Sequence, residues 1–217
     1  MKRKTRKKQE FEVFENCTNN NPHHPGQWHS VFGRPAPLMV ELGAGRCDFS
    51  LGYAANFPHW NVLAIDRKAE RLWAGGRRAR LRGLENVHFL RTDVLLVSEI
   101  FAENEVDRLW ITFPDPYPKK KHEKHRMTGR HFLDAYQKIL RPEGCLLLKT
   151  DNAAFFDWSL EQLETHPTAR LREHTRNLHS SQLRNTENAV LTFYEEKWIA
   201  EEQAKIHYLK ADFHPET

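Results

Sequence analysis

Residues 38–45 read LMVELGAG, an apolar run that carries an acid near its end and leads into two closely spaced glycines. The run has the length and composition of a buried strand, and Glu41 is the acid at its carboxyl end. Gly43 and Gly45 can adopt positive φ, so the backbone can turn sharply there and approach a ligand closely. The stretch therefore predicts the first strand of a sheet with a ligand at its end.

Further short apolar runs follow, and residue patterns typical of helices fill the gaps between them. The runs lie at residues 62–65, 87–90, 106–112 and 145–149. Strands that alternate with helices imply right-handed crossovers and a parallel sheet covered on both faces. We therefore expect an α/β fold with a doubly wound, mostly parallel Rossmann-like sheet. After a strand at 171–176 and a helix at 192–203, residues 206–213 are predicted to form a final, antiparallel edge strand.

The 217 residues fit one domain of ordinary size. Residues 1–36 have little hydrophobic periodicity and contain breakers such as Asn21-Pro22 and Pro25-Gly26, so we predict a basic, partly disordered arm there. The domain proper is expected over residues 37–217. We expect a monomer or a homodimer.

Positive charge is clustered although the formal net charge is only +4. Six of the first eight residues are basic, as are seven between Arg67 and Arg82 and six between Lys119 and Arg130. Such patches favour a polyanionic partner such as a nucleic acid. The three cysteines match neither a disulfide framework nor a zinc pattern, and no apolar run is long enough to cross a membrane. We expect a cytoplasmic protein without a metal and without a membrane partner.

Two more acids follow predicted strands, namely Asp66 and Asp93. Each could be a helix N-cap, but ligands of such sheets bind beyond the carboxyl ends of the strands. Asp66 could accept hydrogen bonds from both hydroxyls of a ribose, and Asp93 from an adenine amino group. Asp48 stands where a dinucleotide fold needs a third glycine, which disfavours a pyrophosphate. An acidic pocket suits S-adenosylmethionine, which has a ribose, an adenine and cationic groups but no phosphate.

Residues 113–126 read FPDPYPKKKHEKHR, a stiff loop with one carboxylate followed by a cationic run. The prolines fix their own φ and push Phe113, Asp115 and Tyr117 toward extended conformations, so Asp115 is held in place. The cationic run is either a solvated turn or a set of phosphate contacts, and its position next to Asp115 favours phosphate contacts. His122 and His125 lie three residues apart, which is not the metalloprotease spacing.

Taken together, these motifs resemble those of the bacterial tRNA (guanine-N(7)-)-methyltransferases, class I S-adenosylmethionine-dependent enzymes that form 7-methylguanosine in the tRNA variable loop. The resemblance implies S-adenosylmethionine as cofactor, S-adenosylhomocysteine as product and tRNA as partner, and it makes Asp115 the catalytic residue. It also implies cofactor contacts by Glu41, Gly43, Gly45, Asp66, Asp93 and Asp115. The implied substrate contacts are Lys119, Lys121, Lys124, Arg126, Asp151, Thr192, Phe193, Tyr194 and Glu195.

The nitrogen at position 7 of guanine has a free lone pair and no proton, so positioning should dominate the chemistry. We expect the Asp115 carboxylate to pair with the N–H donors of guanine, and Tyr117 either to flank the base or to pack beneath the loop. Thr192 and Glu195 also have the spacing of a capping box, and Asp151 could be only a turn residue.

Three other functions are alternatives to this assignment. FPDPY loosely resembles the loops of methyltransferases that act on the exocyclic amino group of adenine, but here the prolines alternate with other residues. A non-catalytic tRNA-binding partner subunit is a second alternative, against which the intact acids argue. A nicotinamide dehydrogenase is disfavoured by Asp48.

Overall fold

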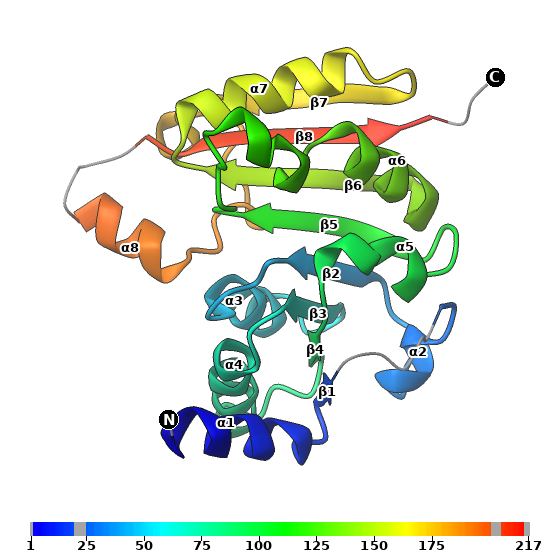
Figure 1. The fold of residues 1–217 in the computed structure, drawn as a ribbon, viewed down its shortest axis with the longest axis vertical. Helices are drawn as coiled ribbons and strands as arrows, with labels where there is room; N and C mark the ends of the chain where they lie inside the picture. The colour runs from blue at the N-terminus through cyan, green and yellow to red at the C-terminus, as the bar shows by residue number, and fades with distance from the viewer. Residues whose placement is uncertain (1, 20–24, 201–204, 215–217) are drawn as a thin grey trace.

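The computed structural model describes residues 2–19, 25–200 and 205–214, and it folds them around one eight-stranded sheet (Figure 1). The strands lie in the order β1-β4-β3-β2-β5-β6-β8-β7. All neighbouring pairs from β1 to β6 are parallel, whereas β8 is antiparallel to β6 and β7. The predicted doubly wound, mostly parallel α/β sheet is therefore confirmed. The strands are β1 Cys17–Asn19, β2 Leu38–Leu42, β3 Asn61–Asp66, β4 Val87–Arg91, β5 Val106–Thr112, β6 Leu140–Thr150, β7 Ala169–Thr175 and β8 His207–Phe213.

Helices cover both faces of the sheet, because successive side chains of each strand point to opposite sides. In β2, Val40 and Leu42 belong to the apolar cluster that α2, α5, α6 and α7 cover, and Met39 belongs to the cluster beneath α1, α3 and α4. Trp198 of α8 packs against this second cluster. The helices are α1 Lys2–Glu12, α2 Trp28–Val31, α3 Asp48–Asn56, α4 Ala69–Leu81, α5 Val97–Ile100, α6 Arg130–Ile139, α7 Ala153–Glu164 and α8 Phe193–Ala200, with 3-10 turns η1 Val94–Leu96, η2 Lys120–His125 and η3 Leu178–Ser180.

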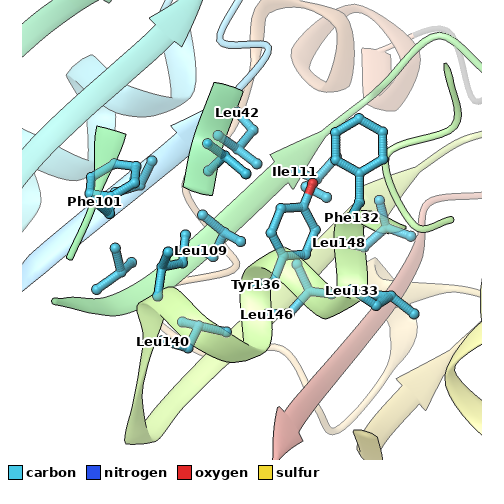
Figure 2. Packing of buried hydrophobic residues seen from close by; sticks show 14 of the residues in the cluster. Leu42, Phe101, Leu109, Ile111, Phe132, Leu133, Tyr136, Leu140, Leu146 and Leu148 are labelled. Atoms are coloured by element: carbon cyan, nitrogen blue, oxygen red, sulfur yellow. The ribbon is translucent and has the colours of Figure 1, made fainter. Parts of the chain in front are cut away.

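The helix α6 packs its buried side chains into the cluster that contains Val40 and Leu42 (Figure 2). Figure 2 shows its side chains Phe132, Leu133 and Tyr136 among leucines and Ile111 of β5 and β6. The buried Tyr136 hydroxyl donates to the carbonyl oxygen of Met127 at 3.0 Å. This bond fixes the segment that follows η2, which borders the candidate site described below.

The fold begins earlier in the chain than the sequence predicted. We expected a partly disordered arm over residues 1–36, but α1 packs on α4, and β1 pairs with β4 through Cys17 and Phe89. Phe11 of α1 is fully buried. A helix with one deeply buried aromatic and a strand of three residues leave too little periodicity to be recognised in the sequence. Residues 1 and 20–24 of the expected arm lie outside the described residues.

The last strand is antiparallel as predicted, but it is not at the edge of the sheet. β8 lies between β6 and β7, and β7 forms the edge. Tyr208 and Leu209 of β8 are buried on opposite faces, whereas Arg170 and Arg172 of β7 are exposed. The polar composition of β7 is therefore what an edge strand needs. The predicted helix at 192–203 is observed as α8 up to Ala200, and residues 201–204 lie outside the described part of the chain.

Candidate functional site

A cleft opens at the carboxyl ends of β2 to β5, beside the point where the strand order reverses between β2 and β5. It consists of two adjoining pockets of about 190 Å³ and about 320 Å³. Both pockets are lined by Gly43, Arg71, Phe113, Pro114 and Asp115. The predicted catalytic residue therefore lies where the two pockets meet.

Glu41 lies at the reversal point and is almost completely buried, with 1% of its surface exposed. Its carboxylate accepts hydrogen bonds from the Thr112 hydroxyl at 2.6 Å, from the Ser50 backbone N–H at 3.1 Å and from the Ser50 hydroxyl. Burial raises the pKa of Glu41 to about 7, against the lowering effect of the bonds from Ser50 and Thr112. The carboxyl group thus lines the larger pocket in a fixed position, and burial makes it harder to ionise than an ordinary glutamate.

The two glycines of the turn after β2 adopt the positive φ that their sequence allows. Gly43 and Gly45 have φ of +70° and +53°, and a Cβ added to Gly43 would lie 3.0 Å from Met127 Cε. The Gly45 N–H donates to Asp66 Oδ2 at 3.0 Å, and the Lys68 N–H donates to Asp66 Oδ1 at 2.8 Å. Asp66 therefore joins the turns after β2 and β3, and only 7% of it is exposed.

Asp93 and its neighbours form the far wall of the smaller pocket, together with Asp66. The Asp93 carboxylate caps η1 by accepting from the Leu95 N–H at 3.1 Å, so the N-cap role considered for this residue is present. Val94 and Leu95 line the same pocket, and Leu95 is 51% exposed. This pocket therefore combines an apolar wall with the carboxylates of Asp93 and Asp66, which are paired with Arg67 at 3.7 Å and with Arg71 at 3.9 Å, respectively.

Asp115 is exposed, and within residues 2–19, 25–200 and 205–214 its carboxylate has no hydrogen-bond or ion-pair partner. One sequence prediction about its loop is wrong, because Phe113 and Tyr117 have φ of +49° and +44° and are not extended. Both residues precede a proline and neither is a glycine, so these conformations are strained. The strained residues flank the aspartate on both sides.

Some residues of the cationic run after Asp115 are exposed, and others form hydrogen bonds within the protein. Lys119, Lys121 and Lys124 are exposed on and before η2. Arg126 is only partly exposed, and its Nε and Nη2 donate to the carbonyl oxygen of Tyr117 at 3.2 and 3.1 Å. The structure thus leaves three lysines exposed shortly after Asp115 in the chain and ties Arg126 to the loop itself.

The segment at the start of α8 forms the capping box that its spacing indicates. The Thr192 N–H donates to Glu195 Oε2 at 3.0 Å, and the Glu195 N–H donates to Thr192 Oγ1 at 3.2 Å. Glu195 is completely buried, so its carboxylate faces the interior and not the cleft. Thr192 and Tyr194 line the larger pocket, and Phe193 is 46% exposed with the Arg46 guanidinium 4.9 Å from its ring centroid.

Asp151 lies at the rim of the larger pocket and is exposed. The N-cap of α7 is the next residue, Asn152, whose side chain accepts from the Phe155 N–H at 2.8 Å. The capping role is therefore filled without Asp151, whose carboxylate stays at the cleft.

Several residues of the cleft were missed by the sequence analysis. Thr112 and Ser50 hold Glu41, Arg71 lines both pockets, and Met127 closes over Gly43. A signal was available only for Thr112, which is a polar residue ending an apolar strand directly before the proline loop. The other three lie on helices or loops whose sequence does not show which side faces the cleft.

The described residues contain neither a candidate metal-ion cluster nor a candidate membrane span. Within the described ranges, no group of three or more histidine, cysteine, aspartate or glutamate side chains could hold a metal ion. None of the helices in these same ranges is long and apolar enough to span a membrane.

Comparison with known proteins gives consistent matches along most of the chain. The family described as "Putative methyltransferase" matches residues 35–208. The tRNA (guanine-N(7)-)-methyltransferase of Cytophaga hutchinsonii is 35% identical over 205 residues, which cover 94% of this chain and 92% of that protein. The protein of the same name from Halalkalibacterium halodurans is 38% identical, with 87% and 83% covered.

Solved structures resemble the chain at much lower identity. The 16S rRNA methyltransferase KamB superposes with a TM-score of 0.64 at 13% identity, covering 90% of this chain and 96% of that one. The 16S rRNA (adenine(1408)-N(1))-methyltransferase from Catenulisporales acidiphilia gives a TM-score of 0.61 at 13% identity, with 91% and 97% covered. These likenesses show a shared fold.

Proposed function

The chain belongs to the tRNA (guanine-N(7)-)-methyltransferase family, and we propose on this premise that it methylates the nitrogen at position 7 of a guanine in tRNA. The family membership confirms the resemblance that the motifs indicated. We further propose that S-adenosylmethionine is the methyl donor and that the target guanine lies in the variable loop. The observation that carries the proposal is the exposed Asp115 carboxylate at the junction of two pockets, in a loop that leads directly into exposed lysines.

The residues of the cleft fit S-adenosylmethionine. The smaller pocket offers Asp66 and Asp93 as acceptors for hydroxyl and amino groups, with Val94 and Leu95 as an apolar wall. The glycine turn is open at Gly45, where an added Cβ would meet no atom closer than 3.8 Å. Glu41 lines the adjoining pocket and supplies a carboxyl group for the cationic end of the cofactor. We propose Glu41, Gly43, Gly45, Asp66, Asp93 and Asp115 as the cofactor-binding residues.

S-adenosylmethionine, when bound, supplies an electrophilic methyl group on its sulfonium. Guanine offers a lone pair at position 7, so no residue has to remove a proton before the transfer. The protein therefore has to hold the nitrogen of the base in line with the methyl group, which can lower the activation free energy by several kcal/mol. We assign this work to Asp115, whose carboxylate can accept from the ring and exocyclic N–H groups of guanine and balance its growing positive charge.

The surface around Asp115 suits a tRNA. Lys119, Lys121 and Lys124 are exposed next to the loop and can contact phosphates. Thr192, Tyr194 and Asp151 border the larger pocket, where they can contact the nucleotide that enters it. Tyr194 is 51% exposed and offers a face on which a base can stack. Glu195 supports this surface from beneath by capping α8, so we propose for it an indirect role in substrate binding.

The direct test is incubation of the purified protein with unmodified tRNA and methyl-labelled S-adenosylmethionine, followed by chromatography and mass spectrometry of the nucleosides. We expect the label in 7-methylguanosine, and nuclease mapping of the labelled fragment should place it in the variable loop. A D115A variant run in parallel controls for a contaminating activity. Label in a methylated adenosine, or binding of tRNA without transfer, would overturn the proposal.

A further inference from the structure

The guanidinium of Arg126 joins the loop of Asp115 to α7. Two of its nitrogens donate to the Tyr117 carbonyl oxygen at 3.2 and 3.1 Å. Its carbon Cζ lies 4.6 Å from the centroid of the Trp158 ring, a distance at which a cation is attracted to the face of the ring. One side chain thus connects the proline loop to a helix that packs on the sheet.

The loop has few other hydrogen bonds that could hold its backbone in place. Pro114, Pro116 and Pro118 lack an N–H, so the loop loses three donors that could attach it to its surroundings. Within the described ranges, the two bonds from Arg126 are the only hydrogen bonds made by the backbone of residues 114–118. They end on Tyr117, one of the two residues of this loop with strained positive φ. A strained conformation of this kind persists only where surrounding contacts enforce it.

Trp158 and the residues around Arg126 are themselves held by hydrogen bonds. The Trp158 indole N–H donates to Glu123 Oε1 on η2 at 3.1 Å. The residues after Arg126 are held by the bond from Tyr136 to the Met127 carbonyl and by a 2.7 Å bond between the buried Thr128 and Ser159 hydroxyls. Arg126 therefore extends from an immobilised segment toward the loop.

We infer that Arg126 and Trp158 are positioning residues for Asp115, and that Arg126 does not serve the enzyme as a phosphate contact. This inference rests on the proposed function, and it replaces the tRNA contact that the motif predicts for Arg126. The guanidinium directs two N–H groups to one carbonyl oxygen while its carbon lies near the Trp158 ring, and the single ammonium of a lysine does not reproduce this pair of contacts. Arg126 accordingly differs in role from Lys121 and Lys124, although all three belong to the same cationic run.

The first experiment separates positioning from phosphate binding by comparing R126A, R126K and W158L with K121A. We measure kcat, the Kd for tRNA and the slope of log Kd against log salt concentration for each variant. Positioning predicts that R126A, R126K and W158L all lower kcat about tenfold or more while the salt slope stays at the wild-type value. K121A should instead lower the slope by roughly 0.7–0.9, the amount expected when one phosphate is no longer neutralised by a lysine.

The same data contain the result that would overturn the inference. Arg126 contacts phosphate if three results occur together. R126A would then lower the salt slope as K121A does, R126K would behave like the wild type, and W158L would leave kcat unchanged. R141A serves as the matched control for the removal of an arginine, because Arg141 lies at the start of β6 and pairs with Asp107 at 3.4 Å. A thermal unfolding curve for every variant shows that it is folded.

The second experiment does not depend on methyl transfer, so it distinguishes failure of this inference from failure of the proposed function. The exposed Lys119, Lys121 and Lys124 are trypsin sites next to the loop that Arg126 holds. We expect trypsin to cut there several times faster in R126K and W158L than in wild-type protein, because the loop opens more often when Arg126 and Trp158 no longer hold it together. The R141A control should be cut at the wild-type rate. Equal cutting rates in all four proteins would overturn the inference even if the wild-type enzyme methylates tRNA.

Discussion

The Lys149 ammonium at the end of β6 lies 3.0 Å from the Glu195 carboxylate of α8, and neither side chain is exposed to solvent. Lys149 Nζ also donates to the Val190 carbonyl oxygen at 2.7 Å. Glu195 in turn caps the helix that carries Tyr194 to the cleft. The pair therefore fixes one wall of the candidate site to the sheet.

Removing one member of this pair should be strongly destabilising, because the other charge stays buried without its partner. We expect K149M and E195L each to lower the free energy of unfolding by about 3–5 kcal/mol, measured by urea denaturation. The double variant K149M/E195L should lose far less than the sum of the two, since it buries no charge. Additive losses would show that the two residues act independently.

The burial of Glu41 should make stability depend on pH. Its pKa is about 7 in the folded protein against an ordinary value of 4.5, so the folded chain binds the proton more tightly than the unfolded chain. The contribution of Glu41 to stability is therefore greatest below pH 4.5 and is lost as the pH rises toward 7. The full loss corresponds to roughly 3 kcal/mol.

An E41Q variant tests this directly, because the amide keeps the shape of the side chain and does not ionise. The free energy of unfolding of the wild type should fall relative to that of E41Q between about pH 5 and 8, by roughly 2–3 kcal/mol. Urea titrations at several pH values in the absence of cofactor measure the difference. A constant difference across this range would mean that Glu41 titrates normally.

The strand framework and the acids at its edge could be predicted because they depend on local patterns. Apolar runs in the sequence correspond to β2 to β6. Acids such as Asp66 and Asp93 follow strands whose carboxyl ends meet at one edge of the sheet. The site predicted from the turn after β2 and the loop after β5 accordingly falls in one cleft.

What could not be predicted depends on contacts between distant segments. Glu195 has the same sequence signature whether it faces tRNA or a buried lysine, and only the position of Lys149 decides. Arg126 belongs to a cationic run, but its guanidinium lies 4.6 Å from the Trp158 ring of α7, a contact that the local sequence does not show. The positive φ of Phe113 and Tyr117 opposes the local preference before a proline, so it arises from the tertiary structure.

The exposed lysines of η2 should contribute to tRNA binding through charge alone. We expect the K121A/K124A double variant to raise the KM for tRNA and to leave kcat nearly unchanged, because neither side chain lies against the reacting groups. The slope of log KM against log salt should fall by roughly 0.7–0.9 for each phosphate that is no longer neutralised. A purely solvated run would change neither quantity. Lys138 is exposed on α6, so K138A is a suitable control for the removal of one positive charge.

Replacement of Asp115 should separate turnover from cofactor binding. The Asp115 carboxylate lies between the two pockets and is not needed to hold the loop, since it has no partner in the described ranges. D115A and D115N should therefore fold normally, and both should lower kcat by about 100-fold or more, because neither keeps the charged acceptor that orients guanine. Equilibrium binding should show that the Kd for S-adenosylmethionine changes much less, since Glu41, Asp66 and Asp93 remain. A variant with wild-type kcat would exclude an orienting role. A variant whose cofactor affinity falls as much as its kcat would instead assign Asp115 chiefly to the cofactor.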